Sequence, residues 1–115
     1  MSPYRNAAYL KFIRSLPCCM TGAPADDAHH VINTGMNLSG MAMKPDDIYC
    51  VPLTRDSHNA VHAIPELQRL QPEWLEDTWR RALWHFGPDS EVGQRIREAR
   101  QHLRMQLGQA GEVVA

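Results

Sequence analysis

The alternation of hydrophobic and polar residues in the first half of the chain predicts one helix and two short strands. In PYRNAAYLKFIRS (3–15), the large apolar residues fall on one side of a helix and the basic residues on the other. AHHVI (28–32) and IYCVPL (48–53) combine β-branched and aromatic residues and therefore predict strands. Two strands are not stable alone in water, so we expect the helices to cover them.

The second half of the chain predicts three helices. TRDSHNAVHA (54–63) begins with cap-type residues. PEWLEDTWRRALWHFG (72–87) has a proline in its first turn and a glycine just past its end. SEVGQRIREARQHLRMQL (90–107) repeats apolar residues on one face. The order of elements indicates a small α+β domain over residues 1–110, and we expect residues 111–115 to form a frayed tail.

Charge is distributed unevenly, although the net charge of the 115 residues is only −1. The first 20 residues carry +3, residues 21–77 carry −6, and the remainder carries +2. Basic ends around an acidic, histidine-bearing middle suit a protein that contacts phosphate at its flanks and holds a cation at its centre. Ordinary solvated helix faces explain the same pattern equally well.

Cysteine usage and hydropathy indicate the cellular compartment in which the protein is expected. The three cysteines are an odd number and form no disulfide framework. The sequence shows no signal peptide and no apolar run long enough to span a bilayer. We therefore expect a cytoplasmic, reduced protein that does not contact a membrane.

Four of the six histidines form two pairs. His58 and His62 are four residues apart on a predicted helix, so they share a face and can chelate one divalent metal ion. A zinc-protease helix needs a glutamate directly after its first histidine, and Asn59 stands there instead, which argues against a protease. Surface or capping roles remain the alternative for such a pair.

The other pair, His29 and His30, lies on a predicted strand, where neighbouring side chains point to opposite faces. His29 can therefore complete a three-histidine metal site with His58 and His62. His30 would lie beside that site. The ordinary histidine pKa of about 6.5 suits a base that takes a proton from water. A three-ligand metal with a base beside it is typical of a hydrolytic site.

The motifs that surround these histidines resemble a known family. RSLPCCMTGAPADDAHH, GMAMKPDD and VPLTRDSHNAVH, together with weaker similarity in LEDTWRRALWHF, resemble the HNH (ββα-metal) endonucleases. They are most similar to the phage recombination-enhancement nucleases, which act with RecA, and to their phage relatives. The resemblance implies a ββα-metal hairpin–helix core over residues 17–63, an N-terminal helix before it and further helices after it.

The resemblance also implies a function, which is DNA hydrolysis at one divalent ion in a bacterial host cell. His30 would be the general base, and His29, His58 and His62 would be the metal ligands. Magnesium or manganese is the expected ion, and imidazole ligands also accept zinc or nickel. The expected partners are DNA and, as a further possibility, a RecA-type recombinase filament. The oligomeric state and the preferred DNA structure stay open.

Many relatives carry a structural zinc knuckle, and this chain departs from it. The four corresponding positions are Cys18, Thr21, Thr54 and Ser57. A single thiolate cannot hold a tetrahedral zinc, so we expect no structural zinc here. Thr54 or Ser57 would instead cap the following helix.

Four further residues are candidates with plain alternatives. Lys44 and Arg55 can contact DNA phosphate, or be ordinary exposed cations. Asp46 and Asp47 can bind metal or orient a histidine, although a turn or strand cap after Pro45 is the commoner role. The six arginines of the last two helices are not expected to form one stripe, which weakens their case as a DNA groove.

Two rival functions remain at this point. One is a non-catalytic DNA-binding module that keeps the fold, as the lost knuckle suggests. The other is a structural metal-binding domain whose helices bind a protein partner.

Overall fold

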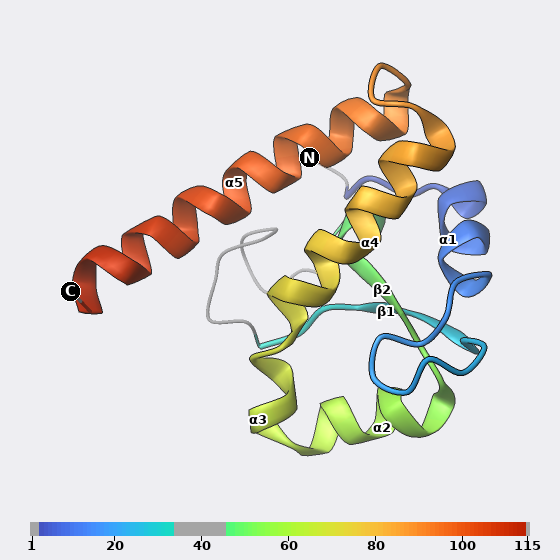
Figure 1. Ribbon diagram of the computed structural model, residues 1–115, viewed down its shortest axis with the longest axis horizontal. Coiled ribbons are helices and arrows are strands. Elements are labelled where there is room, and N and C mark those ends of the chain that lie inside the picture. The colour runs from blue at the N-terminus through green and yellow to red at the C-terminus, as the bar shows by residue number, and fades with distance from the viewer. Residues whose placement is uncertain (1–2, 34–45, 115) are drawn as a thin grey trace.

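The computed structural model describes residues 3–33 and 46–114 of the chain, with side chains to residue 108. It is an α+β structure with a two-stranded antiparallel sheet and helices around it (Figure 1). In chain order the elements are α1 (Ala7–Arg14), β1 (Asp27–His30), the 3-10 turn η1 (Asp47–Tyr49), β2 (Cys50–Leu53), α2 (Arg55–Ala63), α3 (Pro65–Gln68), α4 (Gln71–Phe86) and α5 (Glu91–Val114).

The sheet fixes the direction of the adjacent histidines. In the antiparallel register His29 lies opposite Val51 and His30 lies opposite Cys50. Because strand residues alternate between faces, His29 faces one side of the sheet and His30 the other. Every residue of β2 is buried, so this strand forms the centre of the fold.

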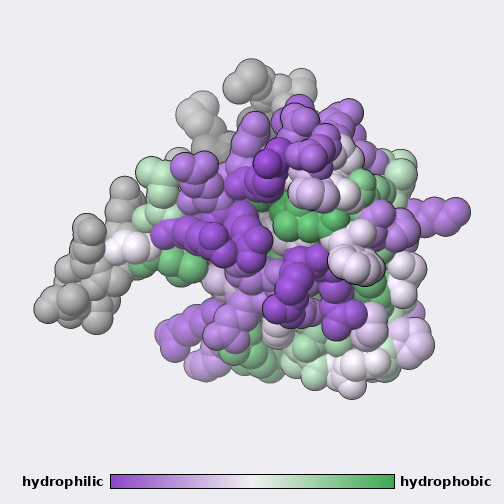
Figure 2. Space-filling model, turned by 45° about the horizontal axis from the view of Figure 1, so that its top comes forward, coloured by the Kyte–Doolittle hydropathy of each residue, from purple (hydrophilic) through white to green (hydrophobic). Residues whose placement is uncertain are grey.

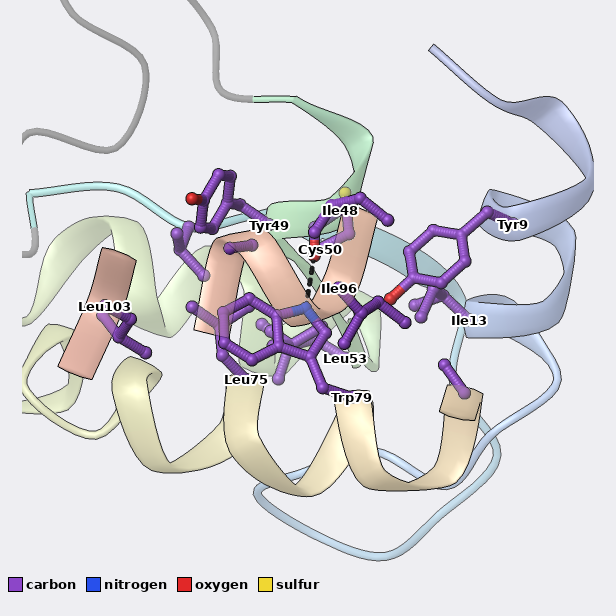
Figure 3. Close-up of a cluster of buried hydrophobic side chains, with 14 of the residues drawn as sticks. Tyr9, Ile13, Ile48, Tyr49, Cys50, Leu53, Leu75, Trp79, Ile96 and Leu103 are labelled. Carbon is purple, nitrogen blue, oxygen red and sulfur yellow. Dashed lines mark hydrogen bonds between the residues drawn. The ribbon is translucent and has the colours of Figure 1, made fainter. Parts of the chain in front are cut away.

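The core lies between the sheet and the helices α1, α4 and α5, which meet around β2 and η1 (Figure 3). Trp79 of α4 is fully buried, and its indole N–H donates to the carbonyl of Ile48 over 2.8 Å. Tyr9 and Ile13 of α1 are also fully buried. Satisfying the indole N–H inside the core avoids the cost of a buried unpaired donor and ties α4 to η1, just before β2.

The first predicted helix and the predicted strands are shorter than expected. Helix α1 begins at Ala7 rather than near Pro3, because the Asn6 side chain accepts a hydrogen bond from the N–H of Tyr9 and caps the helix. The predicted strands 28–32 and 48–53 are found as β1 and β2, with η1 supplying the residues before β2. Their antiparallel pairing confirms the predicted α+β class.

The helices of the second half differ from the predicted ones in two places. The sequence pattern missed α3, whose four residues are too few to show a helical period. Helix α5 continues to Val114, beyond the apolar pattern over 90–107 that predicts it. A glycine within a helix costs only about 1 kcal/mol, so the glycines of this segment do not end it.

The face of the molecule drawn in Figure 2 is mostly polar. Hydrophilic side chains cover much of the face in Figure 2, and hydrophobic ones appear between them in small areas. The distal half of α5 extends away from the rest of the fold (Figure 1). No helix within 3–33 or 46–114 is long and apolar enough to cross a bilayer.

Candidate metal centre

Three histidines from two elements meet at one place. His29 comes from β1, while His58 and His62 come from successive turns of α2. One ring nitrogen of each lies within 4.8 Å of those of the other two. The His29 ring stands nearly perpendicular to both α2 rings, with centroids 4.7 and 5.4 Å away. The structure thus brings together the three residues that the sequence predicts as ligands.

The spacing of the two helical histidines suits a shared ion. Nε2 of His58 lies 3.1 Å from Nε2 of His62. Two nitrogens that each bind one zinc ion at 2.0–2.1 Å with a tetrahedral angle lie about 3.3 Å apart. Only a small side-chain adjustment separates the observed positions from those of two ligands on one ion.

The group is closed on one side and open on the other. His29 is buried, with 1% of its surface exposed, His58 is half-buried, and His62 is exposed. An ion held by these three nitrogens would have a protein floor and a solvent-facing side. That arrangement leaves space for water or a substrate oxygen, which a catalytic site needs and a closed structural site lacks.

Asp27 holds His58 by its second ring nitrogen. Nδ1 of His58 donates to Oδ2 of Asp27 over 2.9 Å, which leaves the lone pair on Nε2, toward His62. Arg55 also donates to both carboxylate oxygens of Asp27, over 2.7 and 2.8 Å. The Arg55 hydrogen bonds, opposed by partial burial and supported by His58, lower the pKa of Asp27 to about 2. A carboxylate behind a histidine is a common support of metal ligands.

Gln71 holds His29 from the first turn of α4. Nε2 of His29 lies 2.9 Å from Oε1 of Gln71, and both side chains are buried. Burial, opposed by this hydrogen bond and supported by the neighbouring His58 and His62, lowers the pKa of His29 to about 4. His29 is therefore neutral at physiological pH, as a metal ligand must be.

His30 lies in a separate group on the other side of the sheet. Its Nε2 donates to Oδ1 of Asp47 over 2.9 Å. Asp47 is almost fully buried, and it also accepts from the guanidinium of Arg5 (3.2 Å) and the N–H of Asn6 (2.7 Å). Asp47 and Cys50 each place a potential ligand atom within 4.8 Å of His30, but the carboxylate of Asp47 is already used in hydrogen bonds. Asp47 thus contacts a histidine, while its role at a metal centre stays a prediction.

Three other predicted residues have different positions. Asp46 accepts from the N–H of Tyr4 over 2.8 Å, so it secures the N-terminal segment rather than a histidine of this centre. The guanidinium of Arg55 is exposed but engaged with Asp27. Lys44 lies outside the described residues.

Cys18, Thr21, Thr54 and Ser57 also converge, beside the N-terminus of α2. Sγ of Cys18 lies 3.5 Å from Oγ of Ser57 and 4.0 Å from Oγ1 of Thr54. Thr54 caps α2 by accepting from the N–H of Ser57 over 3.2 Å, as predicted. Burial opposes ionisation of Cys18, but hydrogen bonds from Thr21, Ser57 and the backbone outweigh it and lower the thiol pKa to about 6.

The comparison with protein families identifies the group to which these residues belong. A family model described as "Protein of unknown function (DUF968)" matches residues 1–68, which is more than half of the chain. The chain belongs to the DUF968 family. The matched segment contains the three clustered histidines, His30, Asp27 and Asp47, whereas Gln71 follows it.

Among curated proteins, the chain is similar to the uncharacterized protein YdfU of Escherichia coli (strain K12). The two are 41% identical over 54 residues, which are 47% of this chain and 15% of YdfU. The chain therefore spans about a seventh of that relative's length. No solved structure matches the chain at a significant level.

Sequence reasoning missed Asp27 and Gln71 as parts of the centre. Asp27 had a signal, because it lies two residues before His29 and so on the same face of the strand. Gln71 had none, since it is 42 residues from His29 and reaches it only through the packing of α4 against the end of β1.

Proposed function

We propose that this DUF968 protein is a metal-dependent DNA endonuclease of the HNH type, in which residues 17–63 form a ββα-metal core. The observation that carries the proposal is the three-histidine group, open to solvent at His62 and supported from behind by Asp27 and Gln71. The order β1, β2, α2 is that of a ββα core, and α2 presents two histidines toward β1.

The residues fit a single divalent ion. Three imidazole nitrogens are a donor set that manganese, zinc and nickel accept, and magnesium or manganese is the ion expected for hydrolysis in cells. When bound, the ion would polarise the scissile phosphate and stabilise the leaving oxygen. The contribution of the protein is to supply neutral His29, to orient His58 through Asp27 and to leave the outer side of the group accessible.

His30 is the proposed general base. It is the direct neighbour of His29, and Asp47 accepts a hydrogen bond from its Nε2. A carboxylate in that position fixes the orientation of the ring and stabilises the imidazolium that forms when His30 takes a proton from water. Asp47 itself accepts hydrogen bonds from Arg5 and from the backbone N–H of Asn6, which hold its carboxylate in place beside His30.

A DNA substrate also needs a positively charged surface. Three of the six later arginines, Arg97, Arg100 and Arg104, line one shallow pocket along α5. Their spacing of three and four residues keeps these three on one helix face, whereas the six arginines together still form no single stripe. Each of the three also has a carboxylate partner, since Arg97 pairs with Asp89 over 3.8 Å and Glu76 pairs with Arg100 (2.8 Å) and Arg104 (3.7 Å). These ion pairs offset much of the positive charge.

Of the rival functions, a structural metal domain is the less consistent with the geometry. A structural zinc site has four protein ligands and is closed, whereas this group has three histidines and an exposed member. A non-catalytic DNA-binding module would keep the surface but would not need the His30–Asp47 pair. A DNA cleavage assay distinguishes this non-catalytic module from the proposed nuclease.

The test is cleavage of supercoiled plasmid and of single-stranded DNA with magnesium or manganese, comparing the wild-type protein with His30→Ala. His102→Ala is the matched control, because His102 is exposed on α5 and lies outside both histidine groups. We expect cutting by the wild type and the control, and a loss of at least about 100-fold in His30→Ala, the range of general-base catalysis.

Metal binding by His30→Ala should remain near the wild-type value, since His30 is not a proposed ligand. Cutting that persists in His30→Ala contradicts the assigned base. If the wild type does not cut, the assay is repeated with a RecA-type filament on the DNA, and inactivity there as well contradicts the nuclease.

A further inference from the structure

The Gln71 side chain has four hydrogen-bond partners, and together they fix which way its amide points. Oε1 accepts from the backbone N–H of Ile32 over 3.0 Å. The amide nitrogen donates to the carbonyls of Ile32 (2.6 Å) and Gln68 (2.9 Å). If the amide oxygen and nitrogen were exchanged, the amide N–H groups would face the N–H of Ile32. The amide oxygen would then face the carbonyls of Ile32 and Gln68. The atom that faces His29 is therefore an acceptor.

This orientation decides the tautomer of His29. An acceptor 2.9 Å from Nε2 requires that Nε2 carry the proton. A neutral imidazole has one N–H and one lone pair, so the lone pair of His29 is on Nδ1. His58 has the opposite arrangement. Its Nδ1–H donates a hydrogen bond to Asp27, so its lone pair is on Nε2.

We propose that Gln71 is a positioning residue of the metal centre, which makes His29 coordinate through Nδ1 while His58 coordinates through Nε2. The inference rests on the proposed three-histidine metal site. Gln71 acts only through His29, with which it shares the buried floor of the group. It also binds both backbone groups of Ile32, so it secures the segment just after β1 together with the ring.

A second buried glutamine offers a matched control. Gln68 lies three residues before Gln71, is also buried, and donates from its side chain to the carbonyl of Val61 over 2.9 Å. No described hydrogen bond joins its side chain to a histidine. Gln68→Met therefore reports the cost of losing a buried glutamine, whereas Gln71→Met reports that cost and the loss of the His29 contact.

A third variant guards against misfolding. Gln71→Glu keeps an acceptor for His29 and for the Ile32 N–H but loses the donors to the two carbonyls. It should therefore lose stability and yet retain the Nε2–H tautomer of His29. Circular dichroism and thermal melting in chelator establish which variants are folded under the conditions of the binding assay.

The experiment has two readouts that do not depend on DNA cleavage. The first is the affinity for Zn²⁺ by calorimetry, and the second is the tautomer of His29 from ¹⁵N chemical shifts, with His29→Asn used for assignment. We expect the wild type to show the Nε2–H tautomer without metal and Nδ1 coordination with Zn²⁺. Gln71→Met should show mixed tautomers and bind Zn²⁺ about 10- to 100-fold more weakly, while Gln68→Met and Gln71→Glu stay within a few-fold of wild type.

Unchanged affinity and tautomer in Gln71→Met, or coordination of wild-type His29 through Nε2, would overturn the inference, and so would absence of Zn²⁺ binding by the wild type. A wild type that binds Zn²⁺ as expected but cuts no DNA, even with the filament present, leaves Gln71 in this role and removes the nuclease. The two proposals therefore fail separately.

Discussion

His29 and His30 are neighbours in the chain but have different partners. His29 faces α2 and Gln71, and His30 faces Asp47 and the N-terminal segment. The alternation of a strand is enough to predict this division from the sequence. The partners themselves are not predictable in the same way, because Asp47 and Gln71 lie 17 and 42 residues further along the chain.

Ionisation of Cys18 should make stability depend on pH between pH 6 and 9. Its pKa is about 6 in the folded protein against 9.0 for an unperturbed thiol, so in this window the unfolded chain binds more protons than the folded one. The free energy of unfolding should therefore rise with pH. The contribution of Cys18 is fully present above pH 9 and is lost as the pH falls through 6. Between about pH 6.5 and about pH 8 the gain is about 2 kcal/mol, near the limit for one proton.

Urea denaturation of the wild type and Cys18→Ala, with reductant and chelator, measures this effect. The difference in free energy of unfolding between the two proteins should grow with pH. Comparing them removes the opposing contribution of Cys19, whose pKa burial raises to about 11. A pH-independent difference would show that the hydroxyl cluster around Cys18 does not stabilise a thiolate.

At the scale of elements, α2 depends on its own N-cap and on residues at and just before the start of β1. Thr54 caps it, and the Asp26 carboxylate accepts from the N–H of Arg55 over 2.9 Å. Asp27 then binds the side chains of Arg55 and His58. The segment before β1 and the start of β1 thus anchor the first turns of α2, and this fixes the helix that carries two of the proposed ligands.

The turn between α4 and α5 requires a glycine at position 93. A Cβ there would meet the backbone carbonyl of Gly87 and lie 2.6 Å from the carbonyl oxygen of Pro88. Gly93→Ala should therefore displace the start of α5 from α4 and destabilise the protein by about 1–3 kcal/mol, the usual cost of overpacking.

Gly108→Ala is the control for this prediction, because a Cβ at Gly108 has no atom within 4 Å. It should stabilise α5 by up to about 1 kcal/mol through helix propensity alone. Thermal melts of both variants give the comparison. Equal effects of the two substitutions would mean that α5 does not pack against the turn in this way.

For the whole molecule, local pattern predicted the elements that have clear start or stop signals. Helix α2 begins after Thr54, and α4 has Pro72 in its first turn and Gly87 past its end. The sequence did not predict α3, which is too short for periodicity, or the extent of α5, which continues past Gly108. Helix α1 starts late because a local side-chain cap at Asn6 competes with the apolar pattern.

The residues of the candidate site likewise divide into those that the sequence predicted and those that it did not. The grouping of His29, His58 and His62 was predictable, because a strand and an i, i+4 helix pair each have a fixed geometry. Asp27 and Gln71 were missed, since each acts through a contact formed only when the helices pack on the sheet. Sequence patterns thus predict the residues that face the proposed ion better than those that hold them in place.

The most direct test of the account is the number of divalent ions bound per chain and its dependence on His62. His62 is exposed, so His62→Ala should fold normally while removing one of three ligands. Calorimetric titration with Zn²⁺, repeated with Mn²⁺, should give one ion per wild-type chain. The affinity should fall by more than about 100-fold in His62→Ala, beyond the range of supporting residues, and stay unchanged in His102→Ala. Absence of binding by the wild type, or equal binding by His62→Ala, would contradict the metal centre on which the proposed nuclease rests.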